Sequence, residues 1–114
     1  LPGFVDRPWA WMAKSSLFVL SSFAEGSGNV LTEAMAVGIP VVSTDCPSGP
    51  NEILDGGRIA PLVPIGDAAA LAEACIDVLK TGIAPSLLEE AVAPFKAEVA
   101  VRSYLAFMKV NAPF

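Results

Sequence analysis

The sequence contains no histidine and only two cysteines, Cys46 and Cys75, among its 114 residues. Without histidine the chain lacks the commonest general base and the commonest zinc ligand of proteins. Catalysis by a serine–histidine or cysteine–histidine pair within this chain is therefore excluded. Two cysteines so far apart in the sequence indicate neither a disulfide framework nor a thiolate metal cage.

Charged residues are scarce as well. They make up 17% of the chain, and twelve acidic residues against seven basic ones give a net charge of −5. The basic residues are scattered and form no cluster, whereas nucleic acids and anionic membrane surfaces bind basic patches. We therefore expect no nucleic-acid partner. Apolar residues reach 54%, slightly above the usual ~45–50%, and such a surplus is typical of a face that meets another domain.

Long hydrophobic runs are also missing, since no apolar stretch approaches the ~20 residues that cross a bilayer. The length suits one domain and lies near the low end for a self-sufficient α/β unit. The sequence opens at LPGFVD without a methionine, and Leu1 already lies in an apolar segment. We expect one domain over residues 1–114, cut from a longer protein and truncated at its N-terminus.

Apolar periodicity predicts short strands alternating with helices. The predicted strands cover 1–5, 16–22, 39–44 and 57–63; the second and third have the composition of buried parallel strands, and Pro61 makes the last an edge or irregular one. The predicted helices cover 7–15, 29–37, 51–54, 68–80, 87–93 and 95–109. This alternation over short connections is typical of an α/β domain with a parallel sheet.

Several helix ends and faces follow from local chemistry. Gly38 is placed to end the helix over 29–37, and Asp67 is placed to cap the helix that follows it. Spacing also predicts the buried faces of the last two long helices: Leu71, Ala74, Cys75 and Val78 on one, and Val101, Tyr104, Leu105 and Met108 on the other.

The stretch FAEGSGNVLTEAMAVGIPVV, residues 23–42, holds Glu25 and Glu33 on either side of a glycine-rich turn. The turn follows a predicted strand, and ligands of parallel sheets bind at the carboxyl ends of strands. Glycines let a ligand approach the backbone, and the first free amides of a helix attract an anion such as phosphate. Carboxylates on both sides of the turn could accept hydrogen bonds from hydroxyls. A phosphate with hydroxyl-rich groups on both sides is the structure of a nucleoside diphosphate sugar.

A structural interpretation of the same residues stays open at this point. Acidic residues near a helix N-terminus stabilise the helix dipole by ~0.3–1 kcal/mol without any ligand. Glycines before helices are common in turns.

The residues also resemble a known family. FVLSSFAEGSGNVLTEAMAVGIPVVSTDCPSGPNEIL resembles the donor-binding segment of glycosyltransferase family 4, a group of retaining enzymes with the GT-B fold. The signature of that family is a glutamate, seven residues and a second glutamate, here Glu25 and Glu33. An alanine-rich helix, a G-x-P-V-V strand and a glycine-containing turn with E-I follow in order. The resemblance spans nearly the whole chain and implies a Rossmann-like three-layer domain, the C-terminal half of a GT-B fold.

The resemblance implies roles for individual residues. Glu33 would bind the ribose hydroxyls, and Glu25, as the catalytic residue, would contact the hydroxyls of the transferred sugar. The amides at the helix start would hold the distal phosphate and stabilise it as a leaving group. The full set of donor-binding residues is Glu25, Gly26, Ser27, Gly28, Asn29, Val30 and Glu33.

The resemblance also implies partners. The donor would be a UDP-, GDP- or ADP-sugar, bound without a metal cofactor. Ser27 departs from the family, which often has an aromatic residue there; we expect binding to survive because the backbone makes the main contacts. The family's basic phosphate contact and its acceptor-binding domain would lie upstream of Leu1, so this half alone would be inactive. The final helix would pack on that missing domain and leave its apolar stripe partly uncovered here.

The full-length protein would transfer a sugar to a carbohydrate or lipid-linked acceptor in polysaccharide biosynthesis. It would work in the cytoplasm at the inner face of the membrane, where the missing domain could make a peripheral contact. Two other functions stay open: a nucleotide-sugar-binding module without turnover, and an epimerase acting on a nucleotide sugar. Epimerases with the GT-B fold use histidine, which this chain lacks.

Four further features have a structural and a functional interpretation. We expect Trp9 and Trp11 to pack at an interface or in the core rather than to stack on a sugar. Asp45 and Asn51 follow a predicted strand and point to its carboxyl end. Glu52 is expected to cap a helix, and Cys46 is expected to be an inert thiol.

Overall fold

The computed structural model describes residues 3–107. A three-stranded sheet forms its centre, with β1 (Phe18–Leu20), β2 (Val41–Thr44) and β3 (Leu62–Val63) in that spatial order. All three strands are parallel, with Phe18 opposite Val41 and Ser43 opposite Leu62. The predicted α/β class with a parallel sheet is confirmed.

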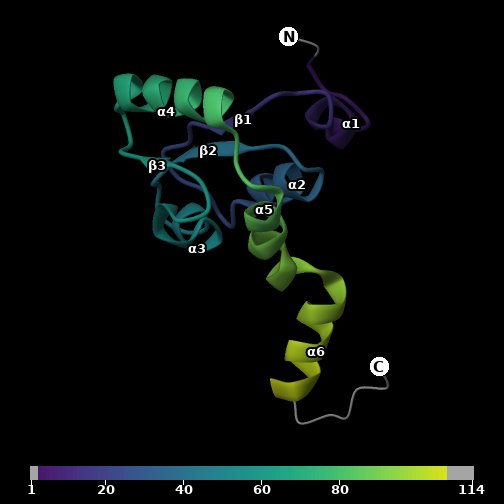
Figure 1. Cartoon of the computed structure of the whole chain (residues 1–114). Helices are drawn as coiled ribbons and strands as arrows, with labels where there is room; N and C mark the ends of the chain where they lie inside the picture. The colour runs from purple at the N-terminus through teal and green to yellow at the C-terminus, as the bar shows by residue number, and fades with distance from the viewer. Residues whose placement is uncertain (1–2, 108–114) are drawn as a thin grey trace.

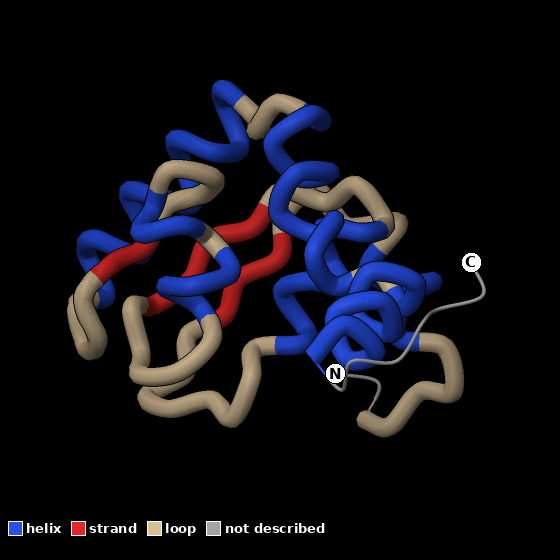
Figure 2. The backbone as a smooth tube through the Cα atoms, turned by 90° about the horizontal axis from the view of Figure 1, so that it is seen from below, coloured by secondary structure: helices blue, strands red, loops and turns tan. Residues whose placement is uncertain are grey.

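Helices cover both faces of this sheet (Figure 1). The helices are α1 (Pro8–Met12), α2 (Asn29–Ala36), α3 (Pro50–Ile53), α4 (Ala68–Thr81), α5 (Pro85–Val92) and α6 (Ala97–Phe107), with short 3-10 helices η1 (Asp55–Gly57) and η2 (Ala93–Phe95). The long helix α4 lies on one face, and α2, α3 and α5 lie on the other. Seen from below, the strands lie between the helices (Figure 2), which gives three layers.

Helix boundaries follow from residues at their ends. Gly28 and Gly38, with φ of +69° and +83°, flank α2 in backbone conformations that favour glycine. The Asp67 side chain accepts a hydrogen bond from the Ala70 amide at 2.9 Å, which caps α4 as predicted. The helix α5 starts at Pro85, two residues before the predicted start, because proline suits the first turn of a helix.

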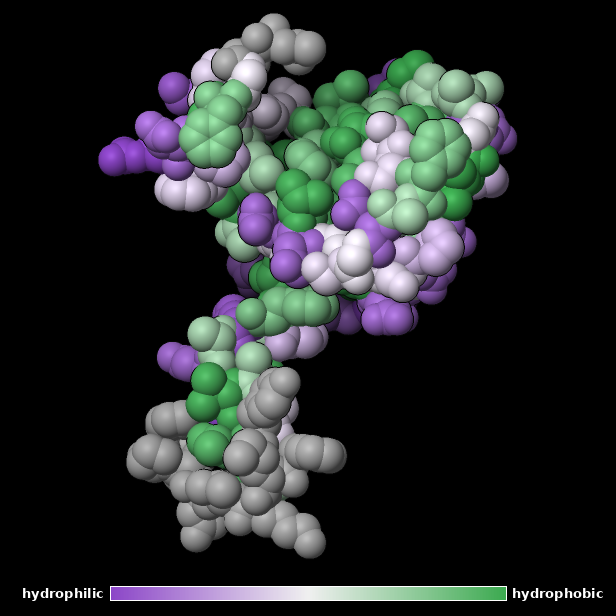
Figure 3. Space-filling view, turned by 180° about the vertical axis from the view of Figure 1, so that it is seen from behind, coloured by the Kyte–Doolittle hydropathy of each residue, from purple (hydrophilic) through white to green (hydrophobic). Residues whose placement is uncertain are grey.

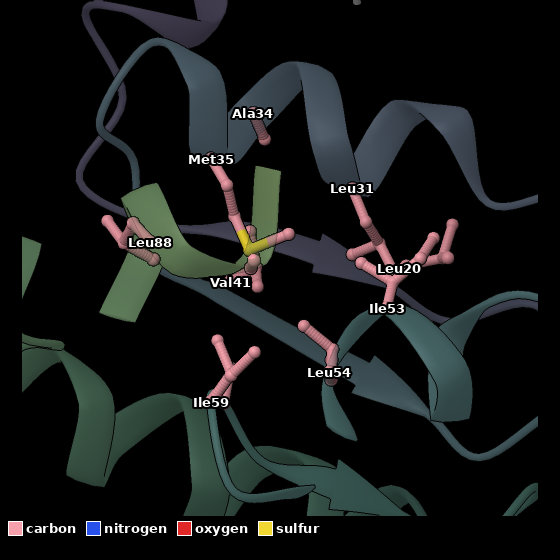
Figure 4. Close-up of a cluster of buried hydrophobic side chains, with 11 residues drawn as sticks. Leu20, Leu31, Ala34, Met35, Val41, Ile53, Leu54, Ile59 and Leu88 are labelled. Carbon is pink, nitrogen blue, oxygen red and sulfur yellow. The ribbon is translucent and has the colours of Figure 1, made fainter. Parts of the chain in front are cut away.

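The main core lies between the sheet and the layer of α2, α3 and α5. Side chains from all of these elements converge there (Figure 4). Leu31 of α2, Leu54 after α3 and Val41 of β2 have no exposed surface. This packing places the start of α2 firmly beside the sheet, which fixes the segment that carries both glutamates.

The opposite face of the sheet is only partly covered. The helix α4 packs on β2 and β3, and Val19 of β1 keeps 39% of its surface exposed. The prediction that β1 is fully buried is therefore wrong. Only Val78 of the four residues predicted to be buried on α4 is buried, and the other three are half-buried. Figure 3 shows apolar side chains gathered between α1 and α4 on this side.

Other predictions needed correction. Residues 3–5 form no strand, and residues 1–2 lie outside the described part. The predicted strand over 57–63 shrinks to two residues at the sheet edge, because residue 57 belongs to η1 and Pro61 has no amide to donate. Trp9 and Trp11 are 55% and 59% exposed, so they do not pack in the core, and their packing at an interface stays a prediction.

The C-terminal helix α6 extends away from the sheet (Figure 1). Val101, on its predicted apolar stripe, is 44% exposed. Met108 and Lys109, where that helix was predicted to continue, lie outside the described residues, and so does the side chain of Tyr104. No helix within residues 3–107 is both long and apolar enough to span a bilayer.

Candidate functional site

Two loops leave the carboxyl edge of the sheet side by side. The first runs from the end of β1 to α2 and contains the glycine-rich turn, residues 25–28. The second runs from the end of β2 to α3. Both strands are parallel neighbours, so their following loops meet at one edge. The predicted location of the turn at a strand carboxyl end is confirmed.

The N-terminus of α2 is open. Gly28 is its N-cap residue, in a left-handed conformation, and no side chain caps the helix. Asn29 and Val30 are the first two helical residues, and their amides have no partner within the helix. The first turn also carries no acidic residue. This helix end therefore presents free N–H groups and the positive end of its dipole, an arrangement that suits an anion.

Glu25 is held by a short chain of hydrogen bonds. The Ser22 hydroxyl donates to Oε1 of Glu25 at 2.5 Å. The hydroxyl of Thr44, a buried residue at the end of β2, donates to the Ser22 carbonyl oxygen at 2.6 Å. The half-buried carboxylate is thus tied through Ser22 to the second strand of the sheet, which limits the positions that it can adopt.

Glu33 has different surroundings. It lies on the exposed side of α2, one turn below the open helix end, and lines a groove of about 600 Å³ with Glu89 of α5 and Lys96 after η2. Phe95, which is 52% exposed, forms part of the same groove. Glu25 is connected by hydrogen bonds to the strand ends instead, so the two carboxylates lie on different parts of the surface around the turn.

The loop after β2 and the helix α3 that follows it pack against the turn. Gly28 is buried against Ile53 and Pro50 of α3. Asn51 of α3 donates through Nδ2 to Oδ1 of Asp45 in this loop at 3.1 Å, so Asp45 and Asn51 meet at the carboxyl edge. Glu52 makes no capping hydrogen bond at α3, and the prediction that it caps a helix end is wrong because Gly49 occupies the N-cap position.

Cys46, next in that loop, is buried with 1% of its surface exposed. Within residues 3–107 no group of three Asp, Glu or Cys side chains comes together to hold a metal ion. Metal-independent donor binding stays a prediction.

Sequence reasoning missed three residues that shape the turn: Ser22, Thr44 and Gly49. Ser22 lies three residues before Glu25, which is a recognisable spacing for a side-chain contact. Thr44 and Gly49 lie on a different loop or strand, and only the pairing of β1 with β2 brings them to the turn.

The fold and the open helix end define a class of protein: an α/β domain with a glycine-rich turn and an uncapped helix N-terminus at the carboxyl edge of a parallel sheet. Comparison with protein families identifies it further. Residues 1–81 match the model of the family "Glycosyl transferases group 1". The chain therefore belongs to the glycosyl transferases group 1 family.

Individual proteins with similar sequences are also named as glycosyltransferases. The chain is 35% identical over 108 residues, 90% of its length, to the lipopolysaccharide core biosynthesis glycosyltransferase LpsE of Rhizobium meliloti. It is 44% identical over 59 residues, 52% of its length, to the phosphatidyl-myo-inositol mannosyltransferase of Mycobacterium leprae. The matched regions cover 32% and 16% of these two relatives, so this chain spans a third or less of their length.

Proposed function

We propose that this chain is the donor-binding half of a retaining glycosyltransferase of family 4, which takes a sugar from a nucleoside diphosphate sugar. The observation that carries the proposal is the uncapped N-terminus of α2 behind Gly28, within the segment that matches the family. Free amides at a helix start bind phosphate, and a glycine at the N-cap leaves room for it.

In this proposal the amides of Gly28, Asn29 and Val30 hold the distal phosphate of the donor, with Gly26 and Ser27 completing the turn. Negative charge builds on that phosphate when the bond to the sugar breaks. Fixed N–H groups that point at it stabilise the leaving group without reorganising. The acceptor then attacks the same face of the sugar, assisted by the leaving phosphate, which retains the anomeric configuration.

The two glutamates flank this phosphate. Glu33 accepts hydrogen bonds from the ribose hydroxyls, which its exposed position one turn below the amides supports. Glu25 accepts hydrogen bonds from hydroxyls of the transferred sugar and is the catalytic residue. The bond from Ser22 supports this role, because a carboxylate held in place loses less freedom when it binds. The E-x7-E spacing thus corresponds to one carboxylate on each side of the diphosphate.

The rest of the protein completes the site. We infer that a preceding acceptor-binding domain supplies a basic phosphate contact and that α6 packs on it. Two observations support this partner: Val99 and Val101 of α6 are exposed, and β1 is an edge strand with an exposed Val19. Exposed apolar surface and open strand edges are what a further domain covers. The isolated half is therefore inactive.

The acceptor is a carbohydrate or a lipid-linked molecule. Two relatives are named for such substrates: the phosphatidyl-myo-inositol mannosyltransferase, and a Campylobacter jejuni transferase named for a diphospho-undecaprenol-linked acceptor, 38% identical over 57% of this chain. We propose that the full-length protein works in polysaccharide synthesis at the cytoplasmic face of the membrane, with a peripheral contact through the preceding domain.

The test is to titrate the ¹⁵N-labelled chain with UDP, GDP and ADP, without added metal, and to follow the backbone amide resonances. We expect one nucleotide to shift the amides of residues 26–30 most strongly, because these groups contact the diphosphate. The preferred base then identifies the donor class. Shifts elsewhere in the folded chain, or none at millimolar nucleotide, would contradict a diphosphate site at the turn.

A further inference from the structure

Gly49 makes an unusually close approach to the glycine-rich turn. A Cβ atom built on Gly49 would lie 2.6 Å from the carbonyl oxygen of Ser27, 2.7 Å from its carbonyl carbon and 3.0 Å from the amide nitrogen of Gly28. Real Cβ contacts shorter than 3.0 Å are essentially not observed. The backbone of Gly49 also has φ of +100°, a conformation that favours glycine.

These three distances describe how the two backbones pack. The Cβ position is almost equally far from the carbon and the oxygen of one carbonyl group, with the next nitrogen slightly farther. A point with such distances lies above the plane of the Ser27–Gly28 peptide. The flat face of this peptide therefore rests on Gly49. The carbonyl and the N–H group lie in the plane and point sideways, in opposite directions, because the peptide is trans.

The next residue of the turn rests on the same support. A Cβ built on Gly28 would lie 3.2 Å from Cδ1 of Ile53 and 3.6 Å from Cδ of Pro50. Both residues belong to α3, and both are buried. Gly49 and α3 therefore form one platform under the turn, and tilting the Ser27–Gly28 peptide would push one of its edges into that platform.

We propose that Gly49 is a positioning residue for the diphosphate site: its missing side chain lets the Ser27–Gly28 peptide lie flat, which fixes the direction of the Gly28 N–H group. The inference rests on the proposed function, in which that N–H group contacts the distal phosphate. A side chain at position 49 lifts or tilts the peptide. Donor groups act on a developing charge only when they point at it, and small displacements have large effects.

The test compares Gly49→Ala with Gly57→Ala in the ¹⁵N-labelled chain. Gly57 is a matched control, because its φ of +98° imposes the same backbone strain while a Cβ there meets nothing within 4 Å. In Gly49→Ala we expect the amide resonances of residues 27–29 to move and the Kd for the preferred nucleotide among UDP, GDP and ADP to rise about tenfold or more. In Gly57→Ala the turn resonances and the Kd stay at the wild-type values.

A second pair covers the case in which Gly49→Ala does not fold. Ile53→Val removes the Cδ1 methyl group under Gly28, and Ile59→Val removes the same group from a residue of similar burial in the same core. We expect only Ile53→Val to shift the Gly28 amide resonance and to weaken nucleotide binding.

Each outcome has one meaning. Unmoved turn resonances in Gly49→Ala, or an unchanged Kd while the wild type binds, would overturn the positioning role and leave the diphosphate site standing. Equal effects of Gly49→Ala and Gly57→Ala would reduce Gly49 to a source of stability. If Gly49→Ala does not fold, equal effects of Ile53→Val and Ile59→Val would overturn the platform under the turn and the positioning role that depends on it. A wild-type chain that binds none of the three nucleotides would overturn the diphosphate site itself, and the positioning role with it.

Discussion

Ser22 Oγ donates a hydrogen bond to Oε1 of Glu25 at 2.5 Å, and this bond connects the candidate catalytic carboxylate to the end of the sheet. Removing the hydroxyl in Ser22→Ala frees the carboxylate. We expect weaker binding of the preferred nucleotide sugar and unchanged binding of the corresponding nucleoside diphosphate, because in the proposed site Glu25 contacts only the transferred sugar. Calorimetric titration with both ligands measures the difference.

The neighbouring Ser21 provides the control for that experiment, since it is exposed. Ser21→Ala should leave both affinities unchanged. If Ser22→Ala weakens the nucleoside diphosphate as much as the nucleotide sugar, then Ser22 acts on the whole turn rather than on Glu25.

Thr44 donates the next hydrogen bond in the chain that holds Glu25, and we expect removal of its hydroxyl to lower the free energy of unfolding. Its buried hydroxyl donates to the Ser22 carbonyl at 2.6 Å, and the Leu20 carbonyl lies 3.4 Å away. Thr44→Val keeps the shape but removes the buried hydroxyl that donates to these carbonyls, which costs about 1–3 kcal/mol. Urea unfolding measures the change. Thr32→Val, which removes an exposed bond to Asn29, should cost clearly less; equal costs would contradict the importance of the buried bond.

Glu33 and Glu89 line the same groove from α2 and α5, which makes them a matched pair. Glu33→Gln retains the shape but loses the charge that, in the proposed site, accepts hydrogen bonds from the ribose hydroxyls. Hydrogen bonds to charged groups contribute about 1.5–3 kcal/mol, so we expect the Kd for the preferred nucleotide to rise roughly tenfold or more. Glu89→Gln should have little effect. A similar loss in both variants would indicate a general effect of groove charge instead of a ribose contact.

Gly28 and Gly38 stand at opposite ends of α2, both with positive φ. An alanine in this conformation costs about 1–2 kcal/mol. A Cβ on Gly28 also meets Ile53 Cδ1 at 3.2 Å, whereas one on Gly38 meets nothing within 4 Å. We therefore expect Gly28→Ala to lower the free energy of unfolding more than Gly38→Ala does. Thermal and urea unfolding of both variants provide the comparison, and equal losses would mean that α3 yields to the added methyl group.

Local chemistry accounts for the parts of the fold that could be read from the sequence. Asp67 caps α4 because its side chain reaches an amide three residues ahead, and Gly38 follows α2 because glycine accepts a left-handed backbone. The strand β2 was recognisable because it is buried on both faces and therefore apolar throughout its first half. The turn at residues 25–28 followed from glycines placed between a strand and a helix.

Tertiary packing accounts for the rest. Val19 is as apolar as its neighbours in the sequence, yet it is exposed, because coverage of β1 depends on where α4 packs. The support of the turn could not be read from spacing either. Thr44 lies 22 residues from Ser22, and Gly49 reaches Ser27 only because β1 and β2 pair in parallel and bring their following loops to one edge. Residue types along the chain thus identify the groups that could bind a donor, and the strand pairing determines which backbone holds them in place.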